Sequence, residues 1–313
     1  MKTKKIVLVA YNIPGFGGRE TVCKKLVALL SKESLQLDIS FLFINDINQE
    51  SVEIDDGWLN GMSFHRIHSE IYNTKVRRIH FAFSFSKFMR KEKPDIVIAI
   101  DPLSCYITSL AKKLIFSKTP IFSWIHSSLE QLYKNIYVIK VDYHLSISSG
   151  ITQQLIDRGV NPDKIFTIFN PISQKSETIP RPSGNITKFL YVGRLTDDDK
   201  NISGMFKALS QVHGDWELNI VGSGRDEKIL RSVADRLNIT SNIIWHGWHN
   251  EPWNYIIDEI NDELYPVDKP SELINKLQNI VNEKKPTDSN IKISVSNLYD
   301  SNFLKRVKST LNI

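Results

Sequence analysis

The chain has 313 residues, of which 41% are hydrophobic, enough for two cores, and no apolar run approaches the roughly 18–20 residues of a membrane span. The first residues lead into a charged segment without a cleavage-site pattern, so a cytoplasmic protein is expected, and two cysteines, Cys23 and Cys105, exclude a disulfide framework or a thiolate metal site. The net charge is +5, but residues 1–175 alone carry +7, from 23 Lys and Arg against 16 Asp and Glu. This basic first half favours anionic partners, and nothing else in the sequence supports nucleic acid.

The first half of the chain alternates short β-rich apolar runs with segments of helical period. This pattern is typical of a doubly wound α/β domain with a parallel sheet, here predicted over residues 1–172. Strands are predicted at Lys5–Tyr11, Leu37–Ile44, Ser63–His68, Asp95–Ile100, Pro120–His126, Tyr143–Ser148 and Lys164–Phe169. Helices are predicted near Arg19–Lys32, Val76–Lys91, Leu103–Phe116 and Ile151–Arg158.

A second α/β pattern follows a polar stretch at residues 173–187, which contains two prolines and a glycine and is predicted to be a linker. The second domain then covers residues 188–313. Its strands are predicted at Phe189–Val192, Glu217–Val221 and Asn242–His246, and its helices near Ser203–Val212 and Arg225–Leu237. Between His246 and Tyr265 there is too little chain for another strand–helix–strand unit of about 30 residues, so an incomplete second domain is expected.

A glycine-rich turn follows the first predicted strand and opens a helix. Gly17 and Gly18 let backbone N–H groups approach a phosphate or a sugar at the positive helix terminus. Glu20 in the first turn interacts favourably with the helix dipole. A tight βα turn without a ligand explains the same residues equally well. The pattern is not Gly-x-Gly-x-x-Gly, which argues against dinucleotide binding.

Two cations, Arg194 and Lys200, lie just past the first strand of the second domain. Because the carboxyl ends of strands face the ligand in a doubly wound sheet, this pair could neutralise a diphosphate. The alternative is a solvated loop in which Asp197 to Asp199 pair with the cations. Consecutive carboxylates on a loop rarely converge on one ion, so no metal site is expected here.

The next strand of the second domain ends in another glycine turn. Gly222 and Gly224 either present backbone to an anion or allow the helix to pack close to the sheet. In the first domain, His126 lies at a strand's carboxyl end, where an imidazole binds or polarises a sugar hydroxyl, or serves only the fold.

Aromatic side chains form two further clusters. Phe81, Phe85 and Phe88 share one face of a predicted helix flanked by basic residues, which indicates either an anionic membrane surface or packing against the sheet. Residues 245–253 contain three tryptophans, which either stack on a base or sugar or form a hydrophobic edge of the core.

Taken in chain order, these motifs resemble the retaining family 4 glycosyltransferases over nearly the whole chain. The motifs are Gly15-Phe16-Gly17-Gly18-x-Glu20, His126, Ser146-Ile147-Ser148, Phe169-Asn170-Pro171-Ile172, Gly193-Arg194-Leu195 with Lys200-Asn201, Val221-Gly222-Ser223-Gly224 and His246-Gly247-Trp248. The resemblance implies the GT-B fold, in which two doubly wound Rossmann-like domains face a cleft. Among family members, the sequence is most similar to those that move galactose from UDP-galactose to a glucose of the lipopolysaccharide core.

The resemblance also assigns roles by position. It implies His126 as the catalytic residue beside the transferred sugar, and it places Gly17, Gly18 and Glu20 in the loop near the donor phosphate and the acceptor. It implies a metal-independent reaction without a cofactor, and it leaves open a peripheral position on the inner face of the inner membrane. The donor diphosphate would be bound by Arg194, Lys200, Gly222 and Gly224.

The sequence departs from the family after the His-Gly-Trp strand. Family members carry a Glu-Gly-Phe-Pro-type loop there and a second glutamate eight residues further on, which bind the sugar and ribose of the donor, and neither occurs in this chain. An internal deletion near Trp253–Ile256 is therefore expected, with weak donor binding and little transfer.

Two other functions remain open at this point. A catalytically inactive, membrane-associated binding or scaffold protein of lipopolysaccharide assembly would need no nucleotide. A nicotinamide-dependent oxidoreductase would need a dinucleotide fingerprint, which the first turn does not supply.

Overall fold

The chain folds into two compact units in a computed structural model. Unit 1 comprises Met1–Gln174 together with Val295–Ile313, and unit 2 comprises Lys175–Ser294. The structure describes residues 3–13, 15, 17–33, 35–46, 56–171, 186–249, 270–283 and 299–313.

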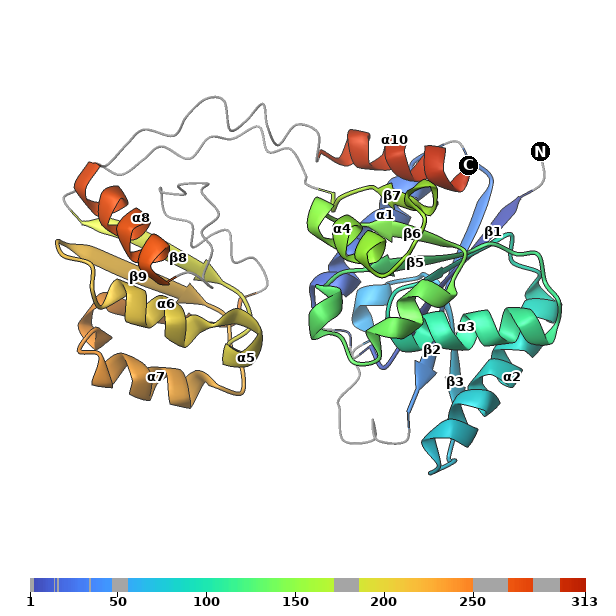
Figure 1. The fold of residues 1–313 in the computed structure, drawn as a ribbon, viewed down its shortest axis with the longest axis horizontal. Coiled ribbons are helices and arrows are strands. Elements are labelled where there is room, and N and C mark those ends of the chain that lie inside the picture. Colours follow the sequence, from blue (N-terminus) through green and yellow to red (C-terminus); the bar gives the residue numbers. More distant parts are fainter. Residues whose placement is uncertain are drawn as a thin grey trace. The chain divides into compact units, whose positions relative to one another are not determined.

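Unit 1 is built on a seven-stranded sheet in the order β3-β2-β1-β4-β5-β6-β7, in which every pair of neighbours is parallel (Figure 1). The order reverses at β1, where the chain crosses to β4, as in a doubly wound fold. The strands are β1 (Lys4–Tyr11), β2 (Leu37–Asn45), β3 (Ser63–His68), β4 (Ile96–Ala99), β5 (Ile121–Ile125), β6 (Tyr143–Ser146) and β7 (Ile165–Thr167).

Helices cover both faces of this sheet. Side chains alternate along β1, so Ile6 and Leu8 pack with α1 and α10 on one face, while Val7 and Val9 pack with α2 and α3 on the other. The helices are α1 (Gly18–Ser31), α2 (Thr74–Glu92), α3 (Pro102–Leu114), α4 (Ser149–Asp157) and α10 (Asp300–Leu311). Short 3₁₀ turns are η2 (Gly57–Leu59), η3 (Leu129–Gln131), η4 (Asn135–Lys140) and η5 (Pro162–Lys164).

The last helix corrects the expected domain boundary. Residues 188–313 are predicted to form the second domain, but α10 belongs to unit 1. Its apolar side chains Phe303, Val307 and Leu311 recur every four residues and are buried in the core that contains α1 and β1. The helical period predicts that this stripe is buried, but it carries no information about which sheet covers it.

Unit 2 contains a smaller parallel sheet in the order β10-β9-β8. Its described strands are β8 (Thr187–Val192), β9 (Trp216–Val221) and β10 (Ile243–Gly247). Its described helices are α5 (Asp197–Lys200), α6 (Ile202–Leu209), α7 (Glu227–Arg236) and α8 (Pro270–Glu283), with the 3₁₀ turn η6 (Thr240–Asn242). Residues 172–185 and 250–269 lie outside the described part, and with them most of the predicted linker and the expected deletion near Trp253–Ile256.

The ten predicted strands are all present, mostly within one or two residues of their predicted ends. The fold class is confirmed as two Rossmann-like α/β units with parallel sheets. Helix α2 confirms the core interpretation of its aromatic face, because Phe81 and Phe85 are fully buried and Phe88 packs against the same cluster. No helix in the described part of the chain is long and apolar enough to cross a membrane.

Candidate active site

The predicted site residues of unit 1 lie at one edge of its sheet. Strands β1, β4, β5, β6 and β7 are parallel, so the loops that follow them meet at their carboxyl ends. Gly17 and Gly18 follow β1, Asp101 follows β4, His126 follows β5 and Asn170 follows β7.

The first of these loops ends at the N-terminus of α1. Glu20 is 4% exposed, and a Cβ placed on Gly17 would lie 3.0 Å from its Oε2 atom, so the carboxylate folds back over the first turn of the helix. That position is favoured by the positive end of the helix dipole. A Cβ on Gly18 would meet no atom within 4 Å, so Gly18, unlike Gly17, has open space beside it.

Asp101 organises the junction between β4 and α3. Its Oδ1 accepts the backbone N–H of Ser104 at 2.8 Å and its Oδ2 accepts the backbone N–H of Tyr11 at 2.7 Å. In return, the Oγ of Ser104 accepts the backbone N–H of Asp101, which completes a capping box. Burial raises the pKa of Asp101, while these hydrogen bonds and the nearby Arg19 oppose the rise. The carboxylate therefore ties the end of β1 to the start of α3.

His126 places a neutral imidazole at this edge. Burial and the positive charge of Arg19 lower the pKa of His126 from 6.5 to about 3, so the ring carries no charge at neutral pH. Its ring lies 4.6 Å from that of Trp124 between centroids. The Nε2 atom is buried and has no hydrogen-bond partner among the described residues. At the carboxyl edge of the sheet, such an atom can exchange a hydrogen bond with a bound ligand.

Asn170 presents a second such atom. Its Oδ1 is also buried without a partner in the described part of the chain. The preceding residue, Phe169, has a φ of 58°, a left-handed conformation that is costly for an aromatic residue. This conformation turns the chain at the end of β7, two strands from His126.

Unit 2 carries the two predicted cations after β8. Arg194 and Lys200 are both exposed, and neither forms an ion pair with the residues that the structure describes. The alternative, in which Asp197 to Asp199 pair with the cations, is tested only for Asp197 and Asp198, because the side chain of Asp199 lies outside the described part of the structure. Asp197 accepts the backbone N–H of Ser203 at 2.7 Å, and Asp198 pairs with Arg225 at 2.7 Å. Neither Asp197 nor Asp198 therefore neutralises Arg194 or Lys200.

The turn after β9 has no room for side chains at Gly222 and Gly224. A Cβ on Gly222, whose φ is +147°, would lie 1.9 Å from the carbonyl oxygen of Gly193, and one on Gly224 would lie 2.4 Å from that of Leu195. The backbone N–H of Gly222 donates to the carbonyl of Gly247 at 2.7 Å. Gly222 and Gly224 therefore let this turn approach the Arg194 loop closely, and the amide of Gly222 is already in use.

The tryptophan cluster divides between core and surface. Trp245 packs edge-on against Phe206, with the Arg231 guanidinium 4.4 Å above its ring, so it belongs to the core of unit 2. Trp248 is 63% exposed, and Trp253 lies outside the described residues.

Two participants at the edge of unit 1 were not predicted as site residues. Asp101 is detectable in the sequence, because Asp-Pro-x-Ser after a strand is an N-cap signal. Arg19 stands within the predicted glycine turn, but only the fold brings its charge near both His126 and Asp101.

Two family models match the chain, "Glycosyltransferase Family 4" over residues 16–175 and "Glycosyl transferases group 1" over residues 174–260. The chain belongs to glycosyltransferase family 4. As a family 4 glycosyltransferase it is similar to the lipopolysaccharide 1,6-galactosyltransferase of Escherichia coli K12, at 36% identity over 82% of this chain and 70% of that protein. The enzyme of the same name from Salmonella typhimurium is 32% identical over 82% of this chain and 71% of that protein.

Solved structures agree with this family 4 fold. The apo form of the lipopolysaccharide outer core galactosyltransferase WaaB aligns with a TM-score of 0.85 and 26% identity, over 98% of this chain and 99% of that one. Anabaena HepE, in complex with UDP and glucose, aligns with a TM-score of 0.72 at 12% identity, over 99% of both chains, and at this identity shows the fold alone.

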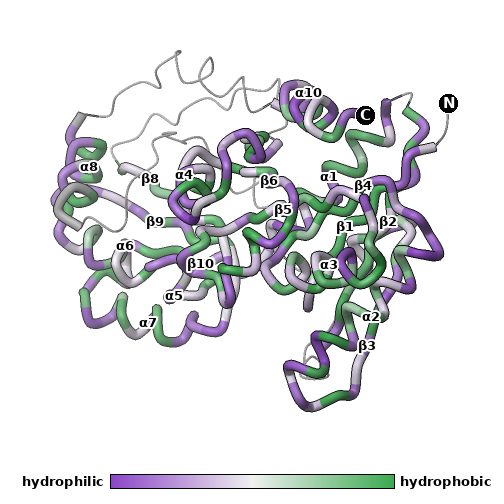
Figure 2. The backbone as a smooth tube through the Cα atoms, turned by 45° about the vertical axis from the view of Figure 1, so that its right-hand side comes forward, coloured by the Kyte–Doolittle hydropathy of each residue, from purple (hydrophilic) through white to green (hydrophobic). Residues whose placement is uncertain are grey.

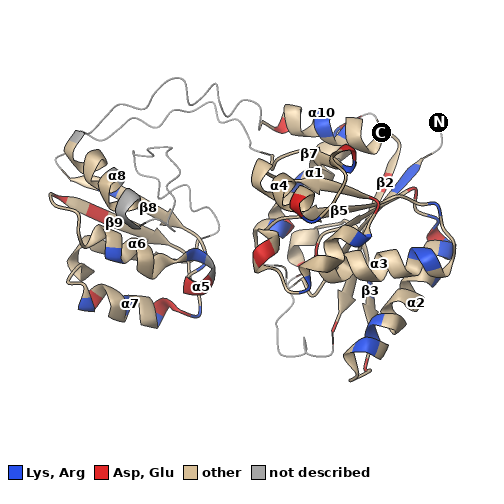
Figure 3. Cartoon of the chain, in the orientation of Figure 1, with Lys and Arg blue, Asp and Glu red and all other residues tan. Residues whose placement is uncertain are grey.

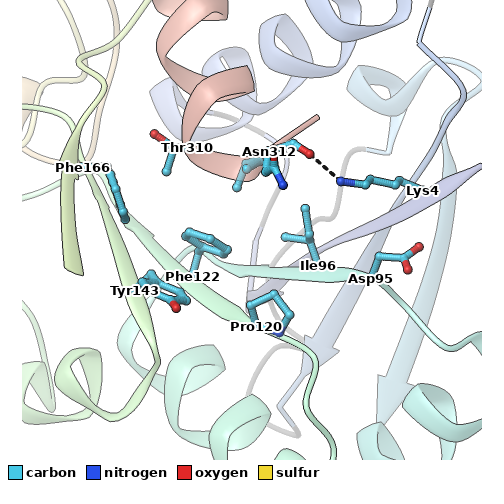
Figure 4. A pocket seen from close by; sticks show the side chains of 10 residues that line it. Lys4, Asp95, Ile96, Pro120, Phe122, Tyr143, Phe166, Thr310 and Asn312 are labelled. Carbon is cyan, nitrogen blue, oxygen red and sulfur yellow. Dashed lines mark hydrogen bonds between the residues drawn. The ribbon is translucent and has the colours of Figure 1, made fainter. Parts of the chain in front are cut away.

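One pocket of this family 4 glycosyltransferase lies away from the candidate site. It has a volume of about 520 Å³, and Phe122, Tyr143, Phe166, Lys4 and Asp95 are among its lining residues (Figure 4). Most of its lining residues stand at or near the amino ends of their strands, whereas ligands of doubly wound folds bind at the carboxyl ends. The described residues contain no group of three His, Cys, Asp or Glu side chains placed to hold a metal ion.

Proposed function

We propose that this glycosyltransferase moves galactose from UDP-galactose to a glucose of the lipopolysaccharide core, with retention of configuration. Membership of family 4 and the likeness to two lipopolysaccharide galactosyltransferases support a role in core assembly. The observation that carries the donor assignment is the pair of exposed cations after β8, which no described carboxylate neutralises.

The roles of these residues follow from the charge that the reaction creates. When the bond between the sugar C1 and the diphosphate oxygen breaks, the electron pair stays on the leaving UDP and positive character grows on the sugar ring. Arg194 and Lys200 stabilise the negative charge on the diphosphate, where fixed cations act without reorganisation. The acceptor hydroxyl forms the new bond to C1, and its proton passes to the oxygen of the departing diphosphate, so the products are the galactoside and UDP.

His126 acts as a neutral hydrogen-bonding group in this proposal. With a pKa of about 3, the ring is uncharged at neutral pH and does not serve as an acid there. Its buried Nε2 instead exchanges a hydrogen bond with a hydroxyl of the transferred sugar. Gly18 and the N-terminus of α1 lie at the same edge of the sheet. In this proposal they contact the donor phosphate and the acceptor.

Titration calorimetry with UDP and UDP-galactose tests the donor assignment. Arg194→Ala should weaken binding of both by at least tenfold, because it removes a cation from the diphosphate. Arg225→Ala is the matched control, since this arginine is exposed in the same region but already paired with Asp198. Equal losses in the two variants, or no UDP binding by the wild type, would contradict the proposal.

We further propose that turnover is slow. The sequence lacks the Glu-Gly-Phe-Pro-type loop and the second glutamate that family members use for the donor's sugar and ribose. A galactosyl-transfer assay should show a rise of at least tenfold when a segment carrying both glutamates is inserted between Trp253 and Ile256. Equal transfer rates with and without the inserted segment would show that the deletion does not limit turnover.

The absence of the Glu-Gly-Phe-Pro-type loop and of the second glutamate favours a second candidate function. This candidate is an inactive protein that binds the lipopolysaccharide core at the inner face of the inner membrane. Binding of core oligosaccharide without any UDP binding would support this second function. UDP binding that depends on Arg194 would rule it out.

A further inference from the structure

Helix α2 has an outer face that no described part of unit 1 covers. Val76, Ile79 and Phe83 are 50%, 56% and 52% exposed. They recur at intervals of three and four residues and so lie on one side of the helix, opposite the buried Phe81 and Phe85. An exposed apolar stripe of this kind marks a contact surface.

Cations accompany this stripe. Apart from Arg77, which is buried and paired with Asp46, residues 74–91 contain five Lys and Arg and no Asp or Glu. The basic residues of α2 appear in blue in Figure 3. Lys87 continues the stripe one turn beyond Phe83, with its Nζ 4.6 Å from the centroid of that ring. Lys75, Arg90 and Lys91 are exposed as well, and Figure 2 shows green and purple alternating along this helix.

The segment from Tyr133 to Tyr137 lies beside α2 and also combines exposed apolar or aromatic side chains with a cation. Arg78 of α2 reaches the hydroxyl groups of Tyr137, at 3.3 Å, and of Tyr133, at 3.5 Å, which places the start of η4 beside the helix. Tyr133 is 66% exposed and Ile136 is 50% exposed. Lys134 lies 5.5 Å from the centroid of the Tyr133 ring, so here too a cation stands beside an exposed aromatic group.

We propose that this surface, formed by Val76, Ile79, Phe83, Lys87, Tyr133 and Ile136, docks unit 1 onto an anionic phospholipid bilayer. Apolar and aromatic side chains enter the boundary between headgroups and acyl chains, while Lys and Arg around them attract the lipid phosphates. A second copy of the chain is a poorer partner, because a two-fold interface on this face would oppose like charges. This surface extends the proposed function and does not depend on turnover.

Sedimentation with lipid vesicles tests the proposal on the full chain without nucleotide. The wild type should bind vesicles that contain phosphatidylglycerol at least tenfold more tightly than vesicles of phosphatidylcholine alone, and raised salt should weaken that binding. The double variant Ile79→Ser/Phe83→Ser should lose at least tenfold in affinity, and so should Lys87→Glu/Arg90→Glu.

Ile229→Ser is the matched control, because Ile229 is 61% exposed on α7 of unit 2. It should bind as the wild type does. The substituted side chains are exposed, so thermal melting of every variant should match the wild type and exclude misfolding. Failure of the wild type to bind anionic vesicles, equal binding to both vesicle types, or unchanged binding by the double variants would overturn the proposal. A result of either kind is independent of UDP binding by unit 2.

Discussion

Arg306 donates a hydrogen bond from its Nε to the main-chain carbonyl oxygen of Ile168, at 3.0 Å and across 138 residues of sequence. Its guanidinium also lies 5.3 Å from the centroid of the Phe169 ring. Phe169 is the residue held in the left-handed conformation, and Asn170 follows it with its buried, unpartnered Oδ1. The final helix therefore supports the turn that presents Asn170 at the carboxyl edge of the sheet.

Arg306→Ala should loosen this turn. Loss of a charged hydrogen bond costs about 1.5–3 kcal/mol, and the contact with the Phe169 ring is lost with it. Hydrogen exchange should therefore accelerate in peptides that cover residues 143–171. Lys305→Ala, an exposed neighbour on the same helix, is the control and should leave exchange unchanged. Unaltered exchange in Arg306→Ala would show that Phe169 holds its conformation without this contact.

Gly222→Ala should destabilise unit 2 severely. The added Cβ would overlap the Gly193 carbonyl oxygen in a backbone conformation that alanine disfavours, so we expect a cost of about 3 kcal/mol or more. Gly18→Ala should change stability by less than about 1 kcal/mol, because its Cβ would meet no atom within 4 Å. Thermal unfolding of the two variants makes the comparison. Similar melting curves would mean that the turn after β9 can move away from Gly193.

Truncation to alanine should affect stability very differently at two phenylalanines of α2. Phe81 is fully buried between the helix and the sheet, so Phe81→Ala should cost about 3–5 kcal/mol in urea unfolding. Phe83, two residues later, is half exposed, and Phe83→Ala should stay within about 0.5 kcal/mol. A large loss in the second variant would indicate that the outer face of α2 is covered in the folded protein.

Stability should fall in acid partly through His144. This residue is buried, its Nδ1 lies 2.8 Å from the Ser123 hydroxyl, and burial lowers its pKa from 6.5 to about 4, with Lys164 contributing. The unfolded chain binds a proton below pH 6.5, whereas the folded chain binds it only near pH 4. Stability is therefore present above pH 6.5 and is lost as the pH falls toward 4, by at most about 1.4 kcal/mol per pH unit.

The pH dependence of urea unfolding between pH 7 and 4.5 measures this effect. His144→Gln removes the titrating group, so its stability should fall less steeply than that of the wild type. The difference between the two slopes isolates His144 from the other groups that titrate in this range. Parallel slopes would mean that the imidazole titrates normally in the folded protein.

The sequence predicts the strands well because their apolar runs are β-rich and are bounded by polar or glycine-containing turns. It also predicts the carboxyl-edge positions of His126, Arg194 and Lys200, since parallel strands dictate where their loops meet. Hydrophobic periodicity does not predict the exposed face of α2, because Val76, Ile79 and Phe83 form a second apolar stripe opposite the buried Phe81 and Phe85. Exposure becomes visible only when α3 and the sheet are in place.

Contacts between distant parts of the chain are the features that the sequence does not predict. The approach of Gly222 to Gly193 and the bond from Arg306 to Ile168 depend on which loops the fold brings together. The assignment of α10 to unit 1 has the same origin. The apolar stripe of an amphipathic helix shows that one face is buried, but it does not show which of the two sheets buries it.

The position of α10 bears on the order in which this protein is made. Phe303, Val307 and Leu311 are part of the core built around β1, although β1 begins at Lys4. A nascent chain thus exposes that face of its first sheet until residues 303–311 have left the ribosome. Unit 2 is encoded between the two parts of unit 1 and has its whole segment available earlier. The unit whose synthesis starts first is therefore the last to be completed.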